Sequence, residues 1–335
     1  MTNRFPIRIA PLNVPFDRRR QTTAVFLWLI ALPVTVAFFF FVCTAPFFWP
    51  LVIAYILFLL FDYAPENGGR RFEFARKSVF WKWFADYFPI KLVKTADLDP
   101  SKNYVFGFHP HGIICLSAWA NFATEANDFS KLFPGITIYL LTLLKNFNIP
   151  FYRDFLLAQG LASVSKESAE HIFAHGPGHS IVIVVGGTVE SLSARPGIYD
   201  LTLLKRLGFV KLAINNGASL VPVFSFGEND IWEQFANEKG SRLWRVQDKV
   251  KQLSGWTIPL IHGRGLFNYD FGLLPHRRSI VTVIGKPIDV ERDPNPSQEK
   301  VLEVQKKYIN GLYQIWNEYK DVYAKNRKRE LTLIE

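Results

Sequence analysis

Cysteine is nearly absent from this chain, which has only two among its 335 residues. Cys43 lies inside an apolar run, and Cys115 lies shortly after a pair of histidines. Two such residues can build neither a disulfide framework nor a cysteine-based zinc site. The composition therefore fits a reducing, cytosol-facing location.

Charge is missing altogether from residues 24–61. This run is about twice the ~20 residues that one helix needs to cross a bilayer. Pro46 and Pro50 lie near its middle, where proline interrupts a helix by removing a backbone donor. The run predicts a membrane hairpin of two antiparallel segments joined at residues 45–50. A cleaved signal peptide is the alternative, but its apolar core spans only about 7–15 residues.

Basic residues flank this run on both sides, at positions 18–20 and within positions 70–77. Because loops that stay in the cytosol are enriched in Lys and Arg, the pattern predicts that both flanks are cytosolic. We therefore divide the chain into a cytosolic tail (1–23), a membrane-embedded hairpin (24–61) and a cytosol-facing domain (62–335).

The rest of the composition favours lipid and anionic partners. Aromatic residues make up 16% of the chain, hydrophobic residues make up 49%, and the formal net charge is +10. A positive protein can bind nucleic acid, the acidic cytosolic leaflet or a phosphorylated co-substrate. No finger spacing or basic recognition helix stands out, so nucleic acid is not an expected partner.

After position 97, short apolar runs alternate with polar and helical stretches, which is typical of an α/β fold. Nearly continuous apolar character predicts strands that are buried on both faces of a sheet. We expect them at residues 104–108, 181–185, 220–226 and 280–284. Apolar residues recur every three or four positions over 301–322, which predicts a C-terminal helix packed on the core.

The segment YVFGFHPHG, residues 104–112, runs a strand directly into two histidines. Strand ends are where α/β folds place reactive groups. A histidine held there, such as His109 or His111, can accept a proton near neutral pH. A general base is the expected role, although by residue statistics alone a structural or half-buried pair is at least as common, and the spacing also allows a metal pair.

A second apolar strand ends in Gly186 and Gly187, and Glu190 follows. Backbone amides at such a turn can receive an oxyanion. Glu190 can orient a histidine, hold a backbone amide or complement a helix dipole. Further on, Arg206 and Lys211 are candidates for phosphate contacts, although solvation at the surface is the commoner fate of such charges.

These blocks, in this order and behind a double-length apolar run, resemble the type-2 diacylglycerol acyltransferase family, which includes monoacylglycerol and wax-ester acyltransferases. Residues 262–267, 271–275 and 284–288 are similar to the family's downstream signatures. The resemblance covers most of the chain after the N-terminal tail. It implies an α/β fold like that of the glycerolipid acyltransferases, with a mixed sheet flanked by helices behind the membrane hairpin.

The resemblance implies an acyl-CoA-dependent enzyme that esterifies diacylglycerol to triacylglycerol, with monoacylglycerol or a fatty alcohol as alternative acceptors. His111 would be the base, favoured over His109 because Gly112 lets the backbone come close to the substrate. Gly112, Gly186 and Gly187 would line the oxyanion turn. Acyl-CoA is then a co-substrate, and no cofactor or metal is expected.

The family also implies where the remaining groups belong. The wider glycerolipid acyltransferases carry Asp five positions after the catalytic histidine, but Ile114 and Leu116 stand at those positions here. Glu190 is therefore the expected carboxylate. The CoA phosphates would be met by four basic residues, Arg206, Lys211, Arg264 and Arg277. The expected location is the endoplasmic reticulum membrane, with lipid droplets as a further site and a homo-oligomer as one option.

Two other functions compete with this interpretation. A lipid hydrolase is suggested by Ser180, which follows Gly178 and His179, but Val182 stands where a nucleophile elbow needs glycine. A non-catalytic hairpin protein that coats lipid droplets needs the apolar run, yet it gives no reason for the histidine and glycine blocks.

Overall fold

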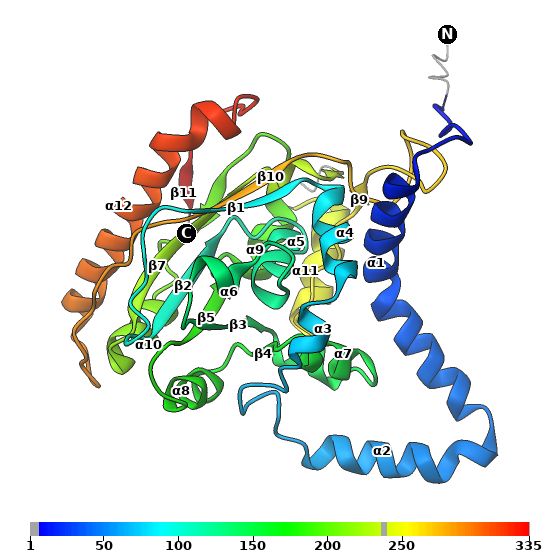
Figure 1. The fold of residues 1–335 in the computed structure, drawn as a ribbon, viewed down its shortest axis with the longest axis horizontal. Helices are drawn as coiled ribbons and strands as arrows, with labels where there is room; N and C mark the ends of the chain where they lie inside the picture. Colours follow the sequence, from blue (N-terminus) through cyan, green and yellow to red (C-terminus); the bar gives the residue numbers. More distant parts are fainter. Residues whose placement is uncertain (1–6, 236–239, 335) are drawn as a thin grey trace.

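A seven-stranded mixed sheet forms the centre of the molecule (Figure 1). The computed structural model describes residues 7–235 and 240–334. All neighbouring strands are parallel except β10 and β7, which are antiparallel. In spatial order the strands are β1 (Ile90–Lys94), β10 (Ile280–Ile284), β7 (Ser219–Phe226), β2 (Tyr104–His109), β5 (His179–Val184), β3 (Thr137–Thr142) and β4 (Ala162–Ser163).

The four predicted strands are confirmed as β2, β5, β7 and β10. Every residue of β2, β7 and β10 is buried, as their continuous apolar character requires. The sequence did not reveal the edge strands β1 and β4, nor β3. Two small sheets complete the strands: β6 (Asp200–Thr202) pairs with β11 (Thr332–Ile334), and β8 (Glu233–Gln234) pairs with β9 (Ile261–His262).

Successive residues of the central strands point to opposite faces, and each face has its own apolar core. One face packs against α4 (Val79–Tyr87), α5 (Leu116–Ala118), the π-helical η2 (Trp119–Ala123), α6 (Phe129–Leu132) and α7 (Tyr152–Ala158). The other face packs against α8 (Lys166–Ala174), α10 (Gly208–Asn216) and α12 (Gln298–Tyr323). The helix α12 confirms the predicted C-terminal helix, with Tyr308 and Leu312 buried.

Shorter elements connect these layers. They are α3 (Glu73–Arg76), η3 (Leu144–Asn148), α9 (Gly187–Ser193), η4 (Glu228–Asp230) and α11 (Arg242–Ser254). The helix α9 follows β5 directly, and α5 follows β2, so both begin at the same edge of the sheet. This edge collects the side chains that the sequence singled out.

The apolar run forms α1 (Phe16–Cys43), the short η1 (Pro46–Phe48) and α2 (Trp49–Phe61). The break therefore falls where the two prolines predicted it. The antiparallel pairing is not confirmed, because the helices diverge from the turn like the arms of a V (Figure 1). Only α1 is both long and apolar enough to cross a membrane, within the part of the chain that the structure describes.

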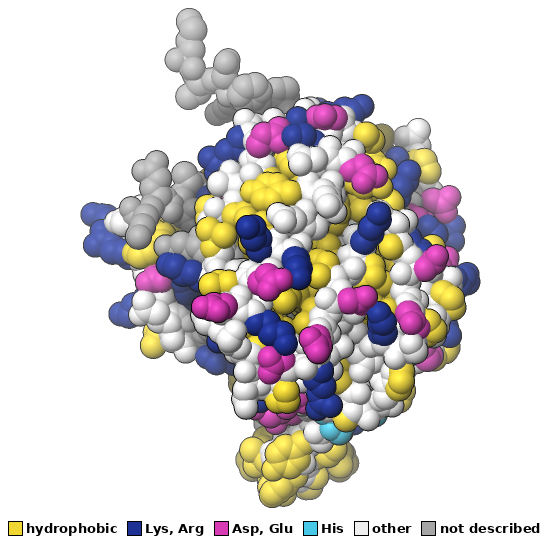
Figure 2. All heavy atoms as spheres, turned by 90° about the vertical axis from the view of Figure 1, so that its left-hand side faces the viewer, with side chains coloured by type: hydrophobic (Ala, Val, Ile, Leu, Met, Phe, Trp, Pro, Cys, Tyr) yellow, Lys and Arg dark blue, Asp and Glu magenta, His cyan; other side chains and the backbone are white. Residues whose placement is uncertain are grey.

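The first half of α1 belongs to the domain rather than to a free hairpin. Ala24 and Val25 are fully buried, and the Trp28 ring lies 5.4 Å from that of Phe84 and 5.5 Å from that of Trp119. Beyond this contact the apolar side chains are largely exposed, and they gather in the protrusion at the bottom of Figure 2. The face above the protrusion carries interspersed charges of both signs.

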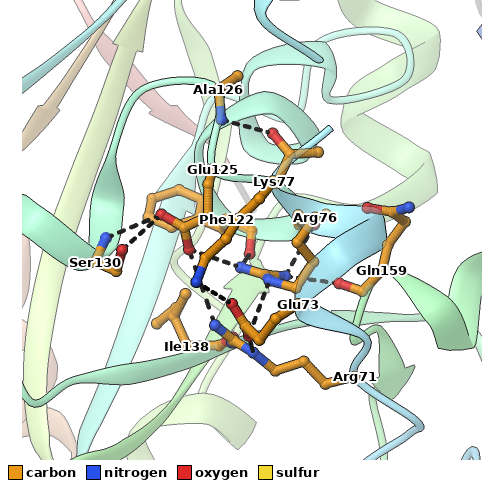
Figure 3. A network of polar contacts seen from close by, with 12 residues as sticks. Arg71, Glu73, Arg76, Lys77, Phe122, Glu125, Ala126, Ser130, Ile138 and Gln159 are labelled. Atoms are coloured by element: carbon orange, nitrogen blue, oxygen red, sulfur yellow. Dashed lines mark hydrogen bonds and ion pairs between the residues drawn. The ribbon is translucent and has the colours of Figure 1, made fainter. Parts of the chain in front are cut away.

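Arg76, one of the basic residues that flank the apolar run, is fully buried inside the domain (Figure 3). Its guanidinium donates to the carbonyl oxygens of Gln159 at 2.6 Å, Ala123 at 2.8 Å and Phe122 at 3.1 Å. The Glu125 carboxylate lies 3.5 Å away. Burial lowers the pKa of Arg76 to about 10. This group ties α3 to the segment after β2, so its charge serves the fold of the domain.

Candidate active site

The predicted catalytic and turn residues meet at the carboxyl ends of β2 and β5, which are neighbours in the sheet. Strand β2 ends at His109, and His111 lies in the turn that follows. Strand β5 ends at Val184, and the next helix, α9, begins at Gly187 and carries Glu190. Two segments that are about 80 residues apart in the chain thus form one cluster.

His109 is completely buried, and its ring is held by Tyr308 of α12. The Tyr308 hydroxyl donates to the carbonyl oxygen of Gly107 at 2.9 Å. Since a hydroxyl has one proton, Tyr308 must accept from His109, whose Nε2 lies 3.0 Å away. The neutral ring of His109 therefore carries its proton on Nε2. Its Nδ1 has no hydrogen-bond partner among the described residues.

Two further observations limit what His109 can do. Burial lowers the pKa of His109 to about 3, so the enclosed ring stays neutral near pH 7. A Cβ atom at position 107 would lie only 2.0 Å from the Tyr308 hydroxyl oxygen. Gly107 is therefore required for Tyr308 to reach the strand, and the buried ring of His109 depends on that approach.

His111 is half-buried, and a backbone carbonyl sets its tautomer. Its Nδ1 lies 3.1 Å from the carbonyl oxygen of Gly112. A carbonyl can only accept, so the proton resides on Nδ1. The lone pair of Nε2 has no hydrogen-bond partner among the described residues. Burial lowers the pKa of His111, which keeps the ring neutral. This histidine has the form that a general base requires.

Glu190 holds backbone amides rather than an imidazole. Its carboxylate accepts the N–H of His111 at 2.5 Å and the N–H of Thr202 at 2.9 Å. Among the described residues, no hydrogen bond joins Glu190 to the ring of either histidine. Burial raises the pKa of Glu190 to about 7, while the two amides and Arg206 act to lower it. The sequence left three roles open for Glu190: orienting a histidine, holding a backbone amide or complementing a helix dipole. The contacts in the structure are those of a residue that holds backbone amides.

Only one of the four basic candidates contacts this cluster in the structure. The exposed Arg206 donates to the carbonyl oxygen of Gly186 at 3.4 Å. Lys211 is exposed on α10. Arg264 is buried, with its guanidinium 4.8 Å from the centre of the Tyr269 ring.

Arg277 is engaged with α1 instead. Its guanidinium donates to the side chains of Gln21 and Thr22, at 2.6 and 2.8 Å, and lies 4.0 Å from the centre of the Tyr87 ring. Burial lowers the pKa of Arg277 to about 10. These contacts hold the beginning of α1 against the domain, which is a different task from the CoA contact expected from the sequence.

Two side chains that the sequence analysis did not nominate belong to the same cluster. Tyr308 was counted only as one apolar position of the C-terminal helix. Glu228, at the end of β7, is buried and accepts the backbone N–H groups of Leu116 and Ser117 at 2.7 and 3.0 Å. A carboxylate directly after a buried strand was a usable signal for Glu228, as it was for Glu190.

The geometry argues against a serine hydrolase. Ser180 lies inside β5, is fully buried, and accepts the backbone N–H of Tyr104 at 3.2 Å. A nucleophilic serine needs an exposed position on a sharp turn. Among residues 7–235 and 240–334, no group of three or more His, Cys, Asp or Glu side chains is arranged to hold a metal ion.

A neutral histidine with a free ring nitrogen, beside a glycine turn at the edge of an α/β sheet, is suited to proton abstraction during acyl transfer. Comparison with known proteins agrees with this class. The family profile described as "Diacylglycerol acyltransferase" matches residues 39–334. The chain belongs to the diacylglycerol acyltransferase family.

Relatives match over nearly their whole length. The chain is 54% identical to diacylglycerol O-acyltransferase 2B of Umbelopsis ramanniana, covering 97% of this chain and 95% of that one. It is 48% identical to diacylglycerol O-acyltransferase 2 of Dictyostelium discoideum, covering 95% and 97%. It is 45% identical to 2-acylglycerol O-acyltransferase 1 of Bos taurus, covering 95% and 96%.

A solved structure is also similar, that of a 1-acyl-sn-glycerophosphate acyltransferase from Thermotoga maritima. The match covers 89% of this chain and 97% of the chain in that structure, with 14% identity and a TM-score of 0.38.

Replacing Tyr308 with Phe should impair both folding and turnover, because it leaves Nε2–H of His109 buried without its partner and removes a hydrogen bond to the carbonyl oxygen of Gly107. A buried group that loses its partner costs about 1–3 kcal/mol. We expect a lower thermal unfolding temperature in detergent and a clear loss of acyltransferase activity. Tyr319→Phe, on the half-buried side of the same helix, is the control and should change neither quantity. A Tyr308→Phe protein as stable and active as the parent would exclude this role.

Proposed function

We propose that the protein transfers the acyl group of acyl-CoA to the free hydroxyl of diacylglycerol and so makes triacylglycerol. Family membership and the names of the most similar relatives support this acceptor. The observation that carries the chemistry is the free Nε2 of His111 on a half-buried turn. Monoacylglycerol is the second acceptor, since 2-acylglycerol acyltransferases match at 45% identity or just below.

The proposed reaction needs no covalent acyl-enzyme. His111 Nε2 removes the proton from the acceptor hydroxyl as its oxygen attacks the thioester carbonyl carbon. The C–S bond then breaks, the ester is released, and the CoA thiolate leaves and takes a proton from the imidazolium. Acyl-CoA is a co-substrate, and the reaction calls for no cofactor or metal.

Backbone amides and a guanidinium would stabilise the charges of this reaction. The tetrahedral oxyanion would lie by the turn at Gly186 and Gly187, with Gly112 leaving room for the substrate. Arg206, exposed and next to Gly186, is the favoured contact for a CoA phosphate. Lys211, Arg264 and Arg277 are secondary candidates, and Arg277 is the weakest because α1 occupies it.

We further propose that the apolar V of residues 34–61 dips into one leaflet. The helix α2 has 13 residues, which corresponds to about 20 Å against the roughly 30 Å of a bilayer core. The first half of α1 is docked on the domain and is not available for crossing. Both chain ends and the 62–335 domain would then face the cytosol, at the endoplasmic reticulum membrane or at lipid droplets. A homo-oligomer is compatible with this arrangement.

The choice of acceptor can be decided directly. Purified protein should be given one radiolabelled acyl-CoA with diacylglycerol, monoacylglycerol or a fatty alcohol. We expect the highest kcat/KM with diacylglycerol, and triacylglycerol as the product. Faster esterification of monoacylglycerol would replace the proposed acceptor, and no transfer to any of the three would refute the enzyme class.

His111→Ala should lower kcat by roughly 10² to 10⁴, the usual contribution of general base catalysis. Expression and membrane binding should not change, since the ring of His111 is only half-buried and its contact with Gly112 is local to the turn. His171→Ala, at an exposed position, is the control. If His111→Ala keeps near-full activity while His109→Ala does not, the role of the base passes to His109.

Glu190→Gln should cut turnover by one to two orders of magnitude. The amide has only one acceptor oxygen, so either the N–H of His111 or the N–H of Thr202 loses its partner, and a bond to a charged group is worth about 1.5–3 kcal/mol. If the two residues act as a unit, His111→Ala combined with Glu190→Gln should be scarcely worse than His111→Ala alone. Multiplicative losses would show that Glu190 acts elsewhere.

A protease-protection assay can test the proposed membrane topology. Tags placed before Arg18 and after Glu335 should both be digested when protease is added to sealed microsomes, because both ends are expected on the cytosolic face. A tag in the turn of the V should resist digestion until detergent is added. Protection of either end in intact microsomes would contradict the proposed arrangement.

A further inference from the structure

We propose that Glu228 is a positioning residue for His111: its ionised carboxylate holds the far end of the turn that carries the base and anchors a one-way chain of hydrogen bonds through the core. This inference rests on the proposed function of His111. It adds a second carboxylate, from a different strand, to the one that Glu190 supplies.

The contacts of Glu228 fall where the turn passes into α5. One carboxylate oxygen accepts the N–H of Leu116 at 2.7 Å, and the other accepts the N–H of Ser117 at 3.0 Å and the Ser117 hydroxyl. Cys115, the residue before Leu116, has a φ of +53°, which is uncommon for residues other than glycine. A strained residue persists only where its surroundings over-determine it. Glu228 provides this constraint.

Glu228 also lies against the beginning of the turn. A Cβ atom at position 112 would lie 2.6 Å from Cγ of Glu228, so only glycine leaves room for the carboxylate. Gly112 moreover has a φ of +62°. Gly112 bears the carbonyl that sets the His111 tautomer. The carboxylate therefore packs against the very peptide that orients the base.

Behind the carboxylate, a chain of buried polar side chains runs into the core. The Ser117 hydroxyl pairs with that of Ser225 at 2.8 Å, and Ser225 pairs with Thr282 at 3.0 Å. The Asn121 amide donates to Thr282 at 3.0 Å and accepts from Asn127 at 2.6 Å. These groups come from α5, β7, β10, η2 and the loop after it, and all but Asn127 are buried.

An ionised Glu228 gives the hydroxyls of this chain one consistent direction. A carboxylate makes Ser117 a donor, so Ser225 must donate to Ser117 and Thr282 to Ser225, and the Asn121 amide then donates to Thr282. Every proton has an acceptor. A carboxyl proton placed toward Ser117 would reverse the chain and direct the Thr282 proton at the Asn121 amide, which is itself a donor. Burial raises the pKa of Glu228 to about 7, even though its three donors act to lower it.

The two carboxylates thus hold opposite ends of residues 111–117. Glu190 binds the N–H of His111, and Glu228 binds the N–H groups of Leu116 and Ser117. Because both act on backbone, neither needs to touch the imidazole. We infer that Glu228 limits the motion of the His111 ring relative to the acceptor hydroxyl, and so affects kcat more than substrate binding.

Glu228→Gln tests this role, because the amide keeps the shape but turns one acceptor into a donor. In full-length protein we expect kcat to fall about 10- to 100-fold, while KM for acyl-CoA changes less than about twofold. Combined with His111→Ala, it should add almost nothing to the loss. Unchanged kcat, or a multiplicative loss in the double variant, would overturn the proposal.

Val283→Ala is the matched control for stability. Val283 is buried in β10 beside Thr282 but lies on the other face, outside the chain. Both variants should be assayed well below their unfolding temperatures. If Val283→Ala lowers kcat as much as Glu228→Gln at a similar loss of stability, the role of Glu228 is structural only.

Milder variants cover the case in which Glu228→Gln does not fold. Ser117→Ala and Ser225→Ala each remove one hydroxyl of the chain and should lower kcat severalfold with unchanged KM; no effect from either would overturn the proposal. His111→Ala separates the two levels of the argument. If that variant stays active, the proposed base is wrong; if it is inactive while Glu228→Gln is normal, only the role of Glu228 fails.

Discussion

The bond from the backbone N–H of His111 to the Glu190 carboxylate is the constraint on which the rest of the site depends. It joins the turn after β2 to α9, which follows the neighbouring strand β5. The other oxygen of Glu190 holds Thr202 at the end of β6, and β6 pairs with β11 near the C-terminus. One buried carboxylate therefore joins the turn after β2 to α9 and β6. The position of the proposed base, His111, depends on contacts from outside its local motif.

Burying this carboxylate is costly, and the fold offsets the cost with backbone amides. An unpaired charge in the interior would simply take up a proton. Two N–H donors and the nearby Arg206 favour the charged form of Glu190, and three donors do so for Glu228. Backbone amides cannot swing away as side chains can. Their hydrogen bonds therefore solvate each carboxylate and at the same time make the turn after β2 more rigid.

The central fold was predictable wherever burial left a pattern in the sequence. The strands β2, β7 and β10 are buried on both faces, which produces uninterrupted apolar runs. The edge strand β1 is only partly buried and contains two lysines, and β4 has two residues, so neither produces such a run. The break in the apolar run followed from its two prolines. The angle between the resulting helices depends on contacts with the domain, which a run of apolar residues does not encode.

The site was only half predictable, for a different reason. Its residue types could be located, since histidines and carboxylates after buried strands are unusual. Their partners could not, because the partner of each is far away in the chain. Tyr308 fits the helical periodicity of an apolar face, and its ring is indeed buried. Its hydroxyl acts on Gly107, 201 positions earlier, and only the packing of α12 on the sheet brings the two together.

The same geometry explains why a backbone carbonyl suits His111 better than a carboxylate would. A carboxylate bonded to the imidazole favours the charged form and raises the pKa of histidine. A larger share of His111 would then be protonated near neutral pH and unable to accept a proton. The carbonyl of Gly112 fixes the same tautomer without a charge, so burial keeps the pKa of His111 low and the ring neutral. Glu190 and Glu228 bind backbone amides and not the imidazole. They can therefore hold the turn in place while the proposed base, His111, keeps a neutral ring.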